Sequence, residues 1–205
     1  MHDFIGDQWR ECIRLALEAY NAGSYGIAAV IVDGQGNLVA KGRNQLKDDL
    51  ESCSAIRMTT IAHAEINALN NLPLTRQRER DLVLYTTVEP CPMCLGAVAM
   101  SRIKRIIIGS ADPYAGSVRL LEQDPFLAQR GITPVFEQGD VEKICFALHY
   151  LSLKRALKPS HAIFDKMSIR YPTHTEKLNV LIETSQLSFE ESLDEARLME
   201  LLLRN

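Results

Sequence analysis

Two short fragments of the chain combine residue types that can bind a metal ion and use it. His63-Ala64-Glu65 places an imidazole and a carboxylate two residues apart, and Cys91-Pro92-Met93-Cys94 places two thiols at the spacing of a metal-binding pair. Zinc takes nitrogen and sulfur ligands in a tetrahedron, and a catalytic zinc keeps one of its positions open for water. One imidazole and two thiolates fill the other three. We therefore predict that His63, Cys91 and Cys94 hold one Zn²⁺ per chain.

Glu65 is not needed as a ligand, which leaves its carboxylate free for proton transfer. Bound zinc lowers the pKa of water towards neutrality, and a nearby carboxylate can take the water's proton and deliver it to a leaving group. Such general acid–base catalysis contributes roughly 10²–10⁴ in rate. The alternative is an ordinary carboxylate at the start of a helix, where the helix dipole favours it. The neighbouring cysteine pair favours the catalytic interpretation.

The cysteine pair also has two other interpretations. A structural zinc site would need a fourth protein ligand, for which Cys53 is the nearby candidate. A redox pair would begin a helix of a thioredoxin-like fold, and the surrounding pattern does not match one. The five cysteines are an odd number without a secreted disulfide spacing, and the sequence shows neither a signal peptide nor a membrane-spanning apolar run. These features predict a cytoplasmic protein that does not associate with membranes.

Apolar periodicity and turn residues predict alternating helices and strands over most of the chain. We expect helices over 7–22, from 63 to before Pro73, over 92–101 and over 140–157, and strands over 26–32, 37–41, 82–87, 105–109 and 133–136. A long polar loop covers 44–60. This alternation is typical of an α/β fold with a central sheet. Both metal-binding fragments then lie where a loop enters a helix, and helix N-termini favour thiolates.

The pattern changes after Pro159, so we expect a zinc-dependent catalytic domain over 1–158 and a helical C-terminal extension over 159–205. Ser188 to Glu191 has the form of a capping box, which predicts a helix that begins there. Its apolar stripe comprises Phe189, Leu193, Leu198, Leu201 and Leu202. An isolated helix of this length is marginal in water, so this one must dock on its own domain or on a partner subunit.

The two fragments in this order resemble the cytidine deaminase superfamily, and within it the guanine deaminases and bacterial tRNA adenosine deaminases. The resemblance spans about Asp7 to Arg155, and its further carriers are Ala28–Val32, Gly42-x-Asn44 and Ser101-Arg102-Ile103. It implies a three-layer α/β/α sandwich around a five-stranded mixed sheet, assembled as a homodimer. It also implies that Asn44 and the backbone of Ala64 contact the substrate base. The plain alternatives are a turn asparagine and a helix-start alanine.

The resemblance leaves the substrate open, and the charge pattern favours a small molecule. The formal net charge is -3, the long loop holds Asp48, Asp49 and Glu51, and the segment from Asp112 to Ser117 lacks a lysine. Acidic residues at the pocket mouth would repel phosphates. We therefore expect hydrolytic deamination of a purine-type base or nucleoside such as guanine, with release of ammonia.

Two alternatives to a small purine stay open. One is tRNA adenosine-to-inosine deamination, supported by the basic groups Arg76, Arg78, Arg80 and Arg102, Lys104, Arg105. Surface charge exposed to solvent is the commoner meaning of such groups. The other is a catalytically silent partner subunit, against which the intact Glu65 argues.

Overall fold

The computed structural model describes residues 5–48 and 56–203 of the 205-residue chain. A five-stranded sheet with the strand order β2-β1-β3-β4-β5 forms its centre. The pairs β1–β2 and β1–β3 are antiparallel, whereas β3–β4 and β4–β5 are parallel, so the sheet is mixed. The elements in chain order are α1 (Asp7–Asn21), β1 (Ala28–Val32), β2 (Leu38–Arg43), α2 (Ala64–Asn70), β3 (Val83–Val88), α3 (Pro92–Met100), β4 (Arg105–Ser110), α4 (Leu120–Gln123), α5 (Pro125–Ala128), β5 (Thr133–Phe136), α6 (Asp140–Ala156), α7 (Ile163–Arg170), α8 (Pro172–Glu183) and α9 (Glu195–Leu203).

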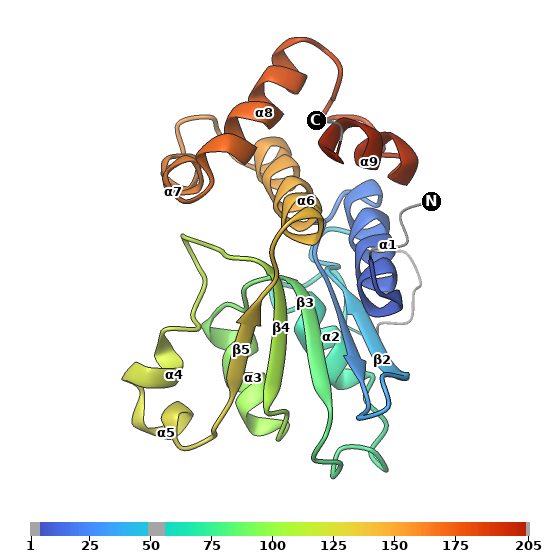
Figure 1. Ribbon diagram of the computed structural model, residues 1–205, viewed down its shortest axis with the longest axis vertical. Helices are drawn as coiled ribbons and strands as arrows, with labels where there is room; N and C mark the ends of the chain where they lie inside the picture. Colours follow the sequence, from blue (N-terminus) through green and yellow to red (C-terminus); the bar gives the residue numbers. More distant parts are fainter. Residues whose placement is uncertain (1–4, 49–55, 204–205) are drawn as a thin grey trace.

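Helices cover both faces of this sheet, which confirms the predicted three-layer α/β/α sandwich (Figure 1). One core lies between the sheet and α2 and α3, and it includes Leu84, Leu95, Val98 and Ile106. The other core lies on the α1 and α6 face. Strands β1 and β4 are buried almost throughout because they have neighbours on both sides and a helix layer on each face. The predicted helices and strands of the first 157 residues are confirmed, with ends that shift by a residue or two.

Helix α2 lies unusually close to β2, and this contact places the start of α2 over the sheet. A Cβ atom added at Gly42 would lie 2.6 Å from the Ala64 carbonyl oxygen and 2.7 Å from the Asn67 carbonyl carbon, so only glycine fits. The Asn67 amide donates to the Arg43 carbonyl at 3.0 Å, and the Asn71 amide donates to the Lys41 carbonyl at 2.9 Å. These side chains pair strand carbonyls that would otherwise be buried without a donor.

The three helices after Pro159 pack on α6 and on one another, above the sheet in Figure 1, and the segment before α9 is bonded to α1. Phe164, Met167, Leu178, Leu198 and Leu202 are buried in the same core as α1 and α6. The extension therefore docks on its own chain, as its apolar stripe requires.

The helix predicted to begin at Ser188 begins instead at Glu195, so the capping-box prediction is wrong. The Ser188 hydroxyl accepts from the Glu190 amide at 3.2 Å, which makes a local turn. The Asn21 side chain donates to the Leu193 carbonyl at 2.9 Å and accepts from the Leu193 amide at 2.7 Å. This pairing holds residue 193 extended against α1, and the helix starts only after it.

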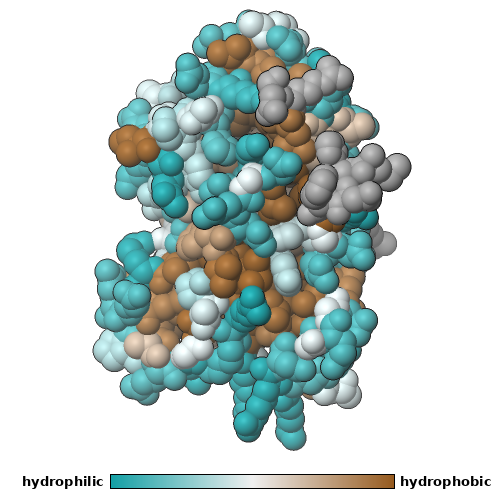
Figure 2. Space-filling model, in the orientation of Figure 1, coloured by the Kyte–Doolittle hydropathy of each residue, from teal (hydrophilic) through white to brown (hydrophobic). Residues whose placement is uncertain are grey.

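Across the described ranges, no helix combines the length and the apolar character that crossing a bilayer requires. Figure 2 shows apolar surface in the middle of the molecule, over the part of the sheet where β4 and β5 lie in Figure 1. The partly exposed Val135 and Phe136 of β5 belong to this edge of the sheet.

Candidate metal centre

His63 and Cys91 occupy the same position in their helices, because each is the N-cap of the helix that follows. Both have extended backbone conformations, and neither side chain makes the hydrogen bond with which an N-cap residue usually satisfies its helix. Pro92 begins α3, where its missing N–H costs nothing, and it ends the strand-to-helix turn after β3. Two helix N-termini thus present their ligands to one point at the end of the sheet.

The three predicted ligands lie together at the separations that a tetrahedral zinc ion requires. The His63 Nδ1 atom is 3.5 Å from Cys94 Sγ and 3.7 Å from Cys91 Sγ, and all three atoms lie within 4.8 Å of one another. Tetrahedral bonds of about 2.0 Å to nitrogen and 2.3 Å to sulfur give an N···S separation of about 3.6 Å. The donor set therefore fits zinc, and Nδ1 is the ligand atom of His63.

The thiols and the imidazole already share their protons as a coupled group. The hydrogen bond from the Cys94 thiol, with a second one to His63, lowers the pKa of Cys91 to about 4. The same hydrogen bond to Cys91, together with burial, raises the pKa of Cys94 far above its usual value. The bond with Cys91 also raises the pKa of His63. The hydrogen bonds within this group thus favour the thiolate form of Cys91, which is the form that binds a metal ion.

Glu65 lies in the first turn of α2, buried beside this group. Burial is the main cause that raises the pKa of its carboxyl, and the neighbouring Cys91 charge acts in the same direction. The Thr86 hydroxyl of β3 lies 3.3 Å from Glu65 Oε1. A buried carboxyl next to a metal centre is the arrangement that proton transfer needs.

A loop after β4 is bonded directly to the residues that precede Cys91. The Glu89 carboxylate accepts from the Asp112 amide at 3.1 Å and from the Val118 amide at 3.0 Å. The Pro90 carbonyl accepts from both the amide and the hydroxyl of Ser117, at 3.1 Å and 2.7 Å. We name residues 111–118 the β4–α4 loop. The sequence prediction missed Glu89, although a carboxylate two residues before a ligand was the available signal.

Asn44 and Ala64, the predicted substrate contacts, lie in the part of the structure that leads into α2. The Asn44 side-chain oxygen accepts from the Ser24 hydroxyl at 2.8 Å and from the Leu46 amide at 3.2 Å. Its amide nitrogen has no acceptor among the residues that the structure describes. Ala64 is the first residue of α2, and its N–H is among those that have no partner within the helix. The role of both residues stays a prediction.

The structure corrects the prediction of an acidic pocket mouth for Asp48 alone. Asp48 is 5% exposed, and its carboxylate oxygens lie 2.7 Å and 3.0 Å from the guanidinium of Arg43, which is wholly buried. A charge neutralised in this way cannot repel phosphate. The sequence suggested a solvent-facing loop because burial of a charged pair depends on tertiary contacts. Asp49, Glu51 and Cys53 lie outside the described residues.

The two groups of basic residues that could favour RNA binding lie at the other end of the strands from the metal centre. Arg105 is paired with Val83 at the start of β3, whereas the ligand Cys91 follows Val88 at its end. That distance along the strand is roughly 17 Å. Arg76 precedes the start of β3, at the same end of the sheet, and its guanidinium donates hydrogen bonds to the carboxylates of Asp33 and Glu79.

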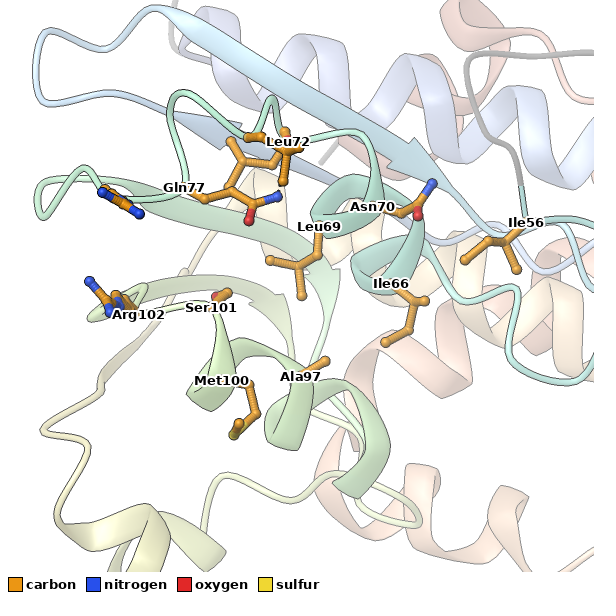
Figure 3. A pocket seen from close by; sticks show the side chains of 12 residues that line it. Ile56, Ile66, Leu69, Asn70, Leu72, Gln77, Ala97, Met100, Ser101 and Arg102 are labelled. Carbon is orange, nitrogen blue, oxygen red and sulfur yellow. Dashed lines mark hydrogen bonds between the residues drawn. The ribbon is translucent and has the colours of Figure 1, made fainter.

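An apolar groove of about 710 Å³ runs between the outer faces of α2 and α3 (Figure 3). Ile66 and Leu69 of α2 face Ala97 and Met100 of α3 across it, and Arg102 lies at the end where α3 finishes. Met100 is 68% exposed. The groove lies along the two helices whose first turns carry the metal ligands.

Comparison with known proteins agrees with this geometry. The chain is 36% identical over 118 residues to the tRNA-specific adenosine deaminase of Haemophilus influenzae, which covers 57% of this chain and 64% of that protein. It is 32% identical over 99 residues to the guanine deaminase of Bacillus subtilis, covering 47% of this chain and 58% of the relative. A solved structure from studies of tRNA:A34 deaminases superposes with a TM-score of 0.56 at 25% identity, over 69% of this chain and 97% of that one.

The family match is located on the metal centre itself. Residues 7–110, about half of the chain, match the cytidine and deoxycytidylate deaminase zinc-binding region. This range contains His63, Glu65, Cys91 and Cys94, together with all of the strands from β1 to β4. The chain therefore belongs to the cytidine and deoxycytidylate deaminase superfamily and is a zinc-binding hydrolase of the deaminase type.

Proposed function

We propose that this protein deaminates a small purine base or nucleoside, with guanine as the first substrate to test. The observation that carries the proposal is the buried Glu65 carboxyl beside three ligands with the correct separations for zinc. Bound zinc supplies a Lewis acid that activates water. A catalytically silent subunit would have no need of this carboxyl.

In the reaction, water adds to the ring carbon that bears the amino group, and that carbon loses ammonia to become a carbonyl. Glu65 takes a proton from the attacking water and gives it to the ring nitrogen beside that carbon. It then carries the second proton, from the added hydroxyl, to the departing amino group, so ammonia leaves, the carbonyl forms and the carboxylate is regenerated. We propose that Asn44 donates from its side-chain nitrogen to an acceptor on the base, because its oxygen already accepts from Ser24 and Leu46. The Ala64 N–H offers a second donor at the start of α2.

The distribution of basic residues supports a small substrate over RNA. The groups around Arg76 and Arg105 lie roughly a strand length from the metal ligands, so they would not hold the phosphates that flank a nucleotide in the pocket. Deaminases that act on RNA or DNA must hold an extruded or single-stranded nucleotide and contact its neighbours. The charge of Asp48 does not favour a small substrate over RNA, because it is paired with Arg43.

The second candidate is adenosine-to-inosine deamination of tRNA, and similarity is the observation that favours it. The Haemophilus influenzae relative is named a tRNA-specific adenosine deaminase, and the solved structure comes from studies of tRNA:A34 deaminases. A tRNA-binding protein that neutralises several phosphates loses affinity steeply as salt rises. The two candidates therefore differ in a measurable salt dependence.

Ammonia release across a panel of substrates tests the proposal. The panel contains guanine, adenine, cytosine, their nucleosides and tRNA, and the Glu65→Gln variant is the control for contaminating activity. We expect turnover of a free purine or its nucleoside, and at most weak, salt-sensitive RNA binding. Inosine formation at one anticodon position with tight, salt-dependent tRNA binding would reverse the ranking. Absence of turnover on every member would refute the enzymatic proposal.

We propose further that the protein is a homodimer, with a second copy covering the groove between α2 and α3. Leu74 and Met100 are exposed apolar side chains along it, the exposed Gln77, Arg78 and Arg102 also line it, and the groove runs along the helices that carry the metal centre. Sedimentation velocity tests this with Met100→Glu, which should shift the protein towards the monomer. Ile169→Glu is the control, because Ile169 is 82% exposed on α7. A wild-type monomer would contradict the proposal.

We propose that residues 1–158 form the deaminase domain and residues 159–205 an extension docked on it. The helices α8 and α9 pack on α6, α7 packs on α8, and Asn21 of α1 is bonded to Leu193, which supports this division. The cysteines Cys12, Cys91, Cys94 and Cys145 are free among the described residues, which supports a reducing compartment such as the cytoplasm.

A further inference from the structure

The β4–α4 loop lies between the metal centre and the C-terminal extension and is bonded to both. On the side of the centre, the Glu89 carboxylate and the Pro90 carbonyl hold its backbone, as described above. On the side of the extension, the Ala111 amide donates to the Tyr171 hydroxyl at 2.7 Å. The extension therefore reaches the loop that borders the metal ligands, although its helices pack on α6 and on one another.

Tyr171 is a rigid anchor for this contact. It lies between α7 and α8, is 5% exposed, and its ring packs on Phe146 of α6 with the centroids 4.6 Å apart. Because the ring is fixed on both sides, the position of its hydroxyl is fixed as well. Ala111 is buried, and without this hydroxyl its N–H would lose a hydrogen bond that a buried backbone group needs.

A second contact joins the extension to Tyr114, near the middle of the loop. The Tyr114 ring lies 5.4 Å from the His161 ring at an interplanar angle of 59°, and Lys166 Nζ lies 5.5 Å from the Tyr114 centroid. Both partners belong to the extension. Tyr114 is 50% exposed, so much of the ring stays accessible. Aromatic rings of this kind are surfaces on which nucleobases stack.

The loop itself has little freedom between these two attachments. Gly116 packs so closely on the Glu89 carboxylate that a Cβ atom there would collide with it. The Asp112 carboxylate accepts from the Tyr114 and Ala115 amides at 2.9 Å and 3.0 Å, which makes a tight local turn. The loop is thus held at Ala111 by the extension and at Asp112, Ser117 and Val118 by the residues that precede Cys91.

We propose that the C-terminal extension is a positioning element of the active site. Through Tyr171 and the Tyr114–His161 contact it fixes the β4–α4 loop, and this loop, with Tyr114 on it, determines how substrate is bound. Tyr171 and His161 are positioning residues, and Tyr114 is a specificity-determining residue for a planar base. The inference rests on the proposed function, because it names what orients the substrate of that same site.

Two tyrosines on the same interface allow a matched test. Tyr171→Phe keeps the ring on Phe146 and removes the hydroxyl that binds Ala111. Tyr150→Phe also keeps a ring stacked on Phe146 and removes a hydroxyl bonded to Asn179, which is remote from the loop. Both variants lose a hydrogen-bonded phenolic hydroxyl, and that of Tyr171 also interacts with Glu142 of α6, so a purely structural role predicts lower stability without a specific change in the loop.

Amide hydrogen exchange across residues 111–118 and steady-state kinetics on the best panel substrate are the two measurements. For Tyr171→Phe we expect loop exchange at least about tenfold faster than in Tyr150→Phe. We also expect KM to rise about three- to tenfold, with kcat and zinc content within about twofold of wild type. Tyr114→Ala should raise KM similarly, and Tyr114→Phe should restore it because the ring face returns.

Equal exchange and equal KM in the two tyrosine variants would overturn the inference. So would a fall in kcat and zinc content without a change in KM, since that would make the contact part of the metal centre's stability. The exchange measurement needs no substrate. Failure of every panel substrate with fast loop exchange in Tyr171→Phe would therefore refute the proposed function and leave the positioning role supported.

Discussion

The Thr86 hydroxyl lies between the Glu65 carboxyl and a backbone carbonyl of its own strand. Its oxygen is 3.3 Å from Glu65 Oε1 and 3.1 Å from the Val88 carbonyl oxygen. One hydroxyl proton can be donated to only one of them at a time. With Glu65 ionised, the hydroxyl donates to the carboxylate. With Glu65 protonated, the carboxyl can donate to Thr86, whose hydroxyl then donates to Val88. Both protonation states of a proton carrier are thus hydrogen-bonded.

Thr86→Val should therefore slow turnover while leaving the metal in place. The substitution keeps the shape of the side chain and removes the hydroxyl, so one protonation state of Glu65 loses its partner. We expect kcat to fall by about tenfold, which corresponds to about 1.4 kcal/mol. Thr87→Val is the control, because its hydroxyl serves the Ala28 amide instead, at 3.0 Å. Equal activity in both variants would show that Thr86 has no part in proton transfer.

Glu65→Gln should abolish most activity and keep the fold. The amide has the size and hydrogen-bonding reach of the carboxylate but cannot accept and return a proton. We expect a loss of at least ~10² in kcat, with unchanged zinc content. Ammonia release and metal analysis on the same preparation check this. Normal turnover by the Gln variant would rule out Glu65 as the proton shuttle.

Purified protein should contain about one zinc per chain, bound by one nitrogen and two sulfurs with a further position open. X-ray absorption reports this ligand set directly. Cys91→Ser and Cys94→Ser should lose both metal and activity, and chelation of the wild type should lower its melting temperature until zinc is returned. A centre closed by a further sulfur would contradict a catalytic site.

Two glycines should respond to alanine in opposite directions. Gly42→Ala brings a methyl group against the backbone of α2, so we expect a loss of stability of about 2 kcal/mol or more and weaker metal binding. Gly96 lies within α3 with open space around its Cα, and alanine there should stabilise by about 0.5–1 kcal/mol. Denaturant unfolding of both variants measures the difference. A tolerated Gly42→Ala would mean that α2 can move away from β2.

Asp48→Ala should be strongly destabilising, because it leaves the Arg43 guanidinium buried without its bidentate partner. Breaking a buried pair costs about 3–5 kcal/mol, and the nearby Glu18 carboxylate, 3.2 Å from Arg43 Nε, places the expected loss near the lower end. Lys143→Ala removes an exposed pair with Asp140 and should cost less than about 1 kcal/mol. Similar losses in the two variants would show that the Arg43 pair is not a buried anchor.

The sequence predicted those parts of the molecule that depend on local patterns. Strand β1 was recognisable from its β-branched residues, α3 from Pro92, and the metal ligands from their types and spacing. It could not predict that Asp48 is buried, because its partner Arg43 is another charged residue and only tertiary packing hides both. Nor could it predict that the chain at Leu193 is held by Asn21, which overrides the capping box at Ser188. Tyr171 and Ala111 are likewise joined only by the fold.

The metal ligands lie at the starts of two different helices, α2 and α3, so the complete centre depends on how these helices pack on the sheet. His63 lies before α2 and Cys91 after β3, so the imidazole and the thiols meet only once β3 has paired with β1 and α2 has settled on β2. An unfolded chain offers a metal ion no more than the Cys91–Cys94 pair. The complete three-ligand set is therefore a property of the assembled sheet and not of any one segment. Because the complete ligand set exists only in the folded arrangement, metal binding would stabilise that arrangement over the unfolded chain.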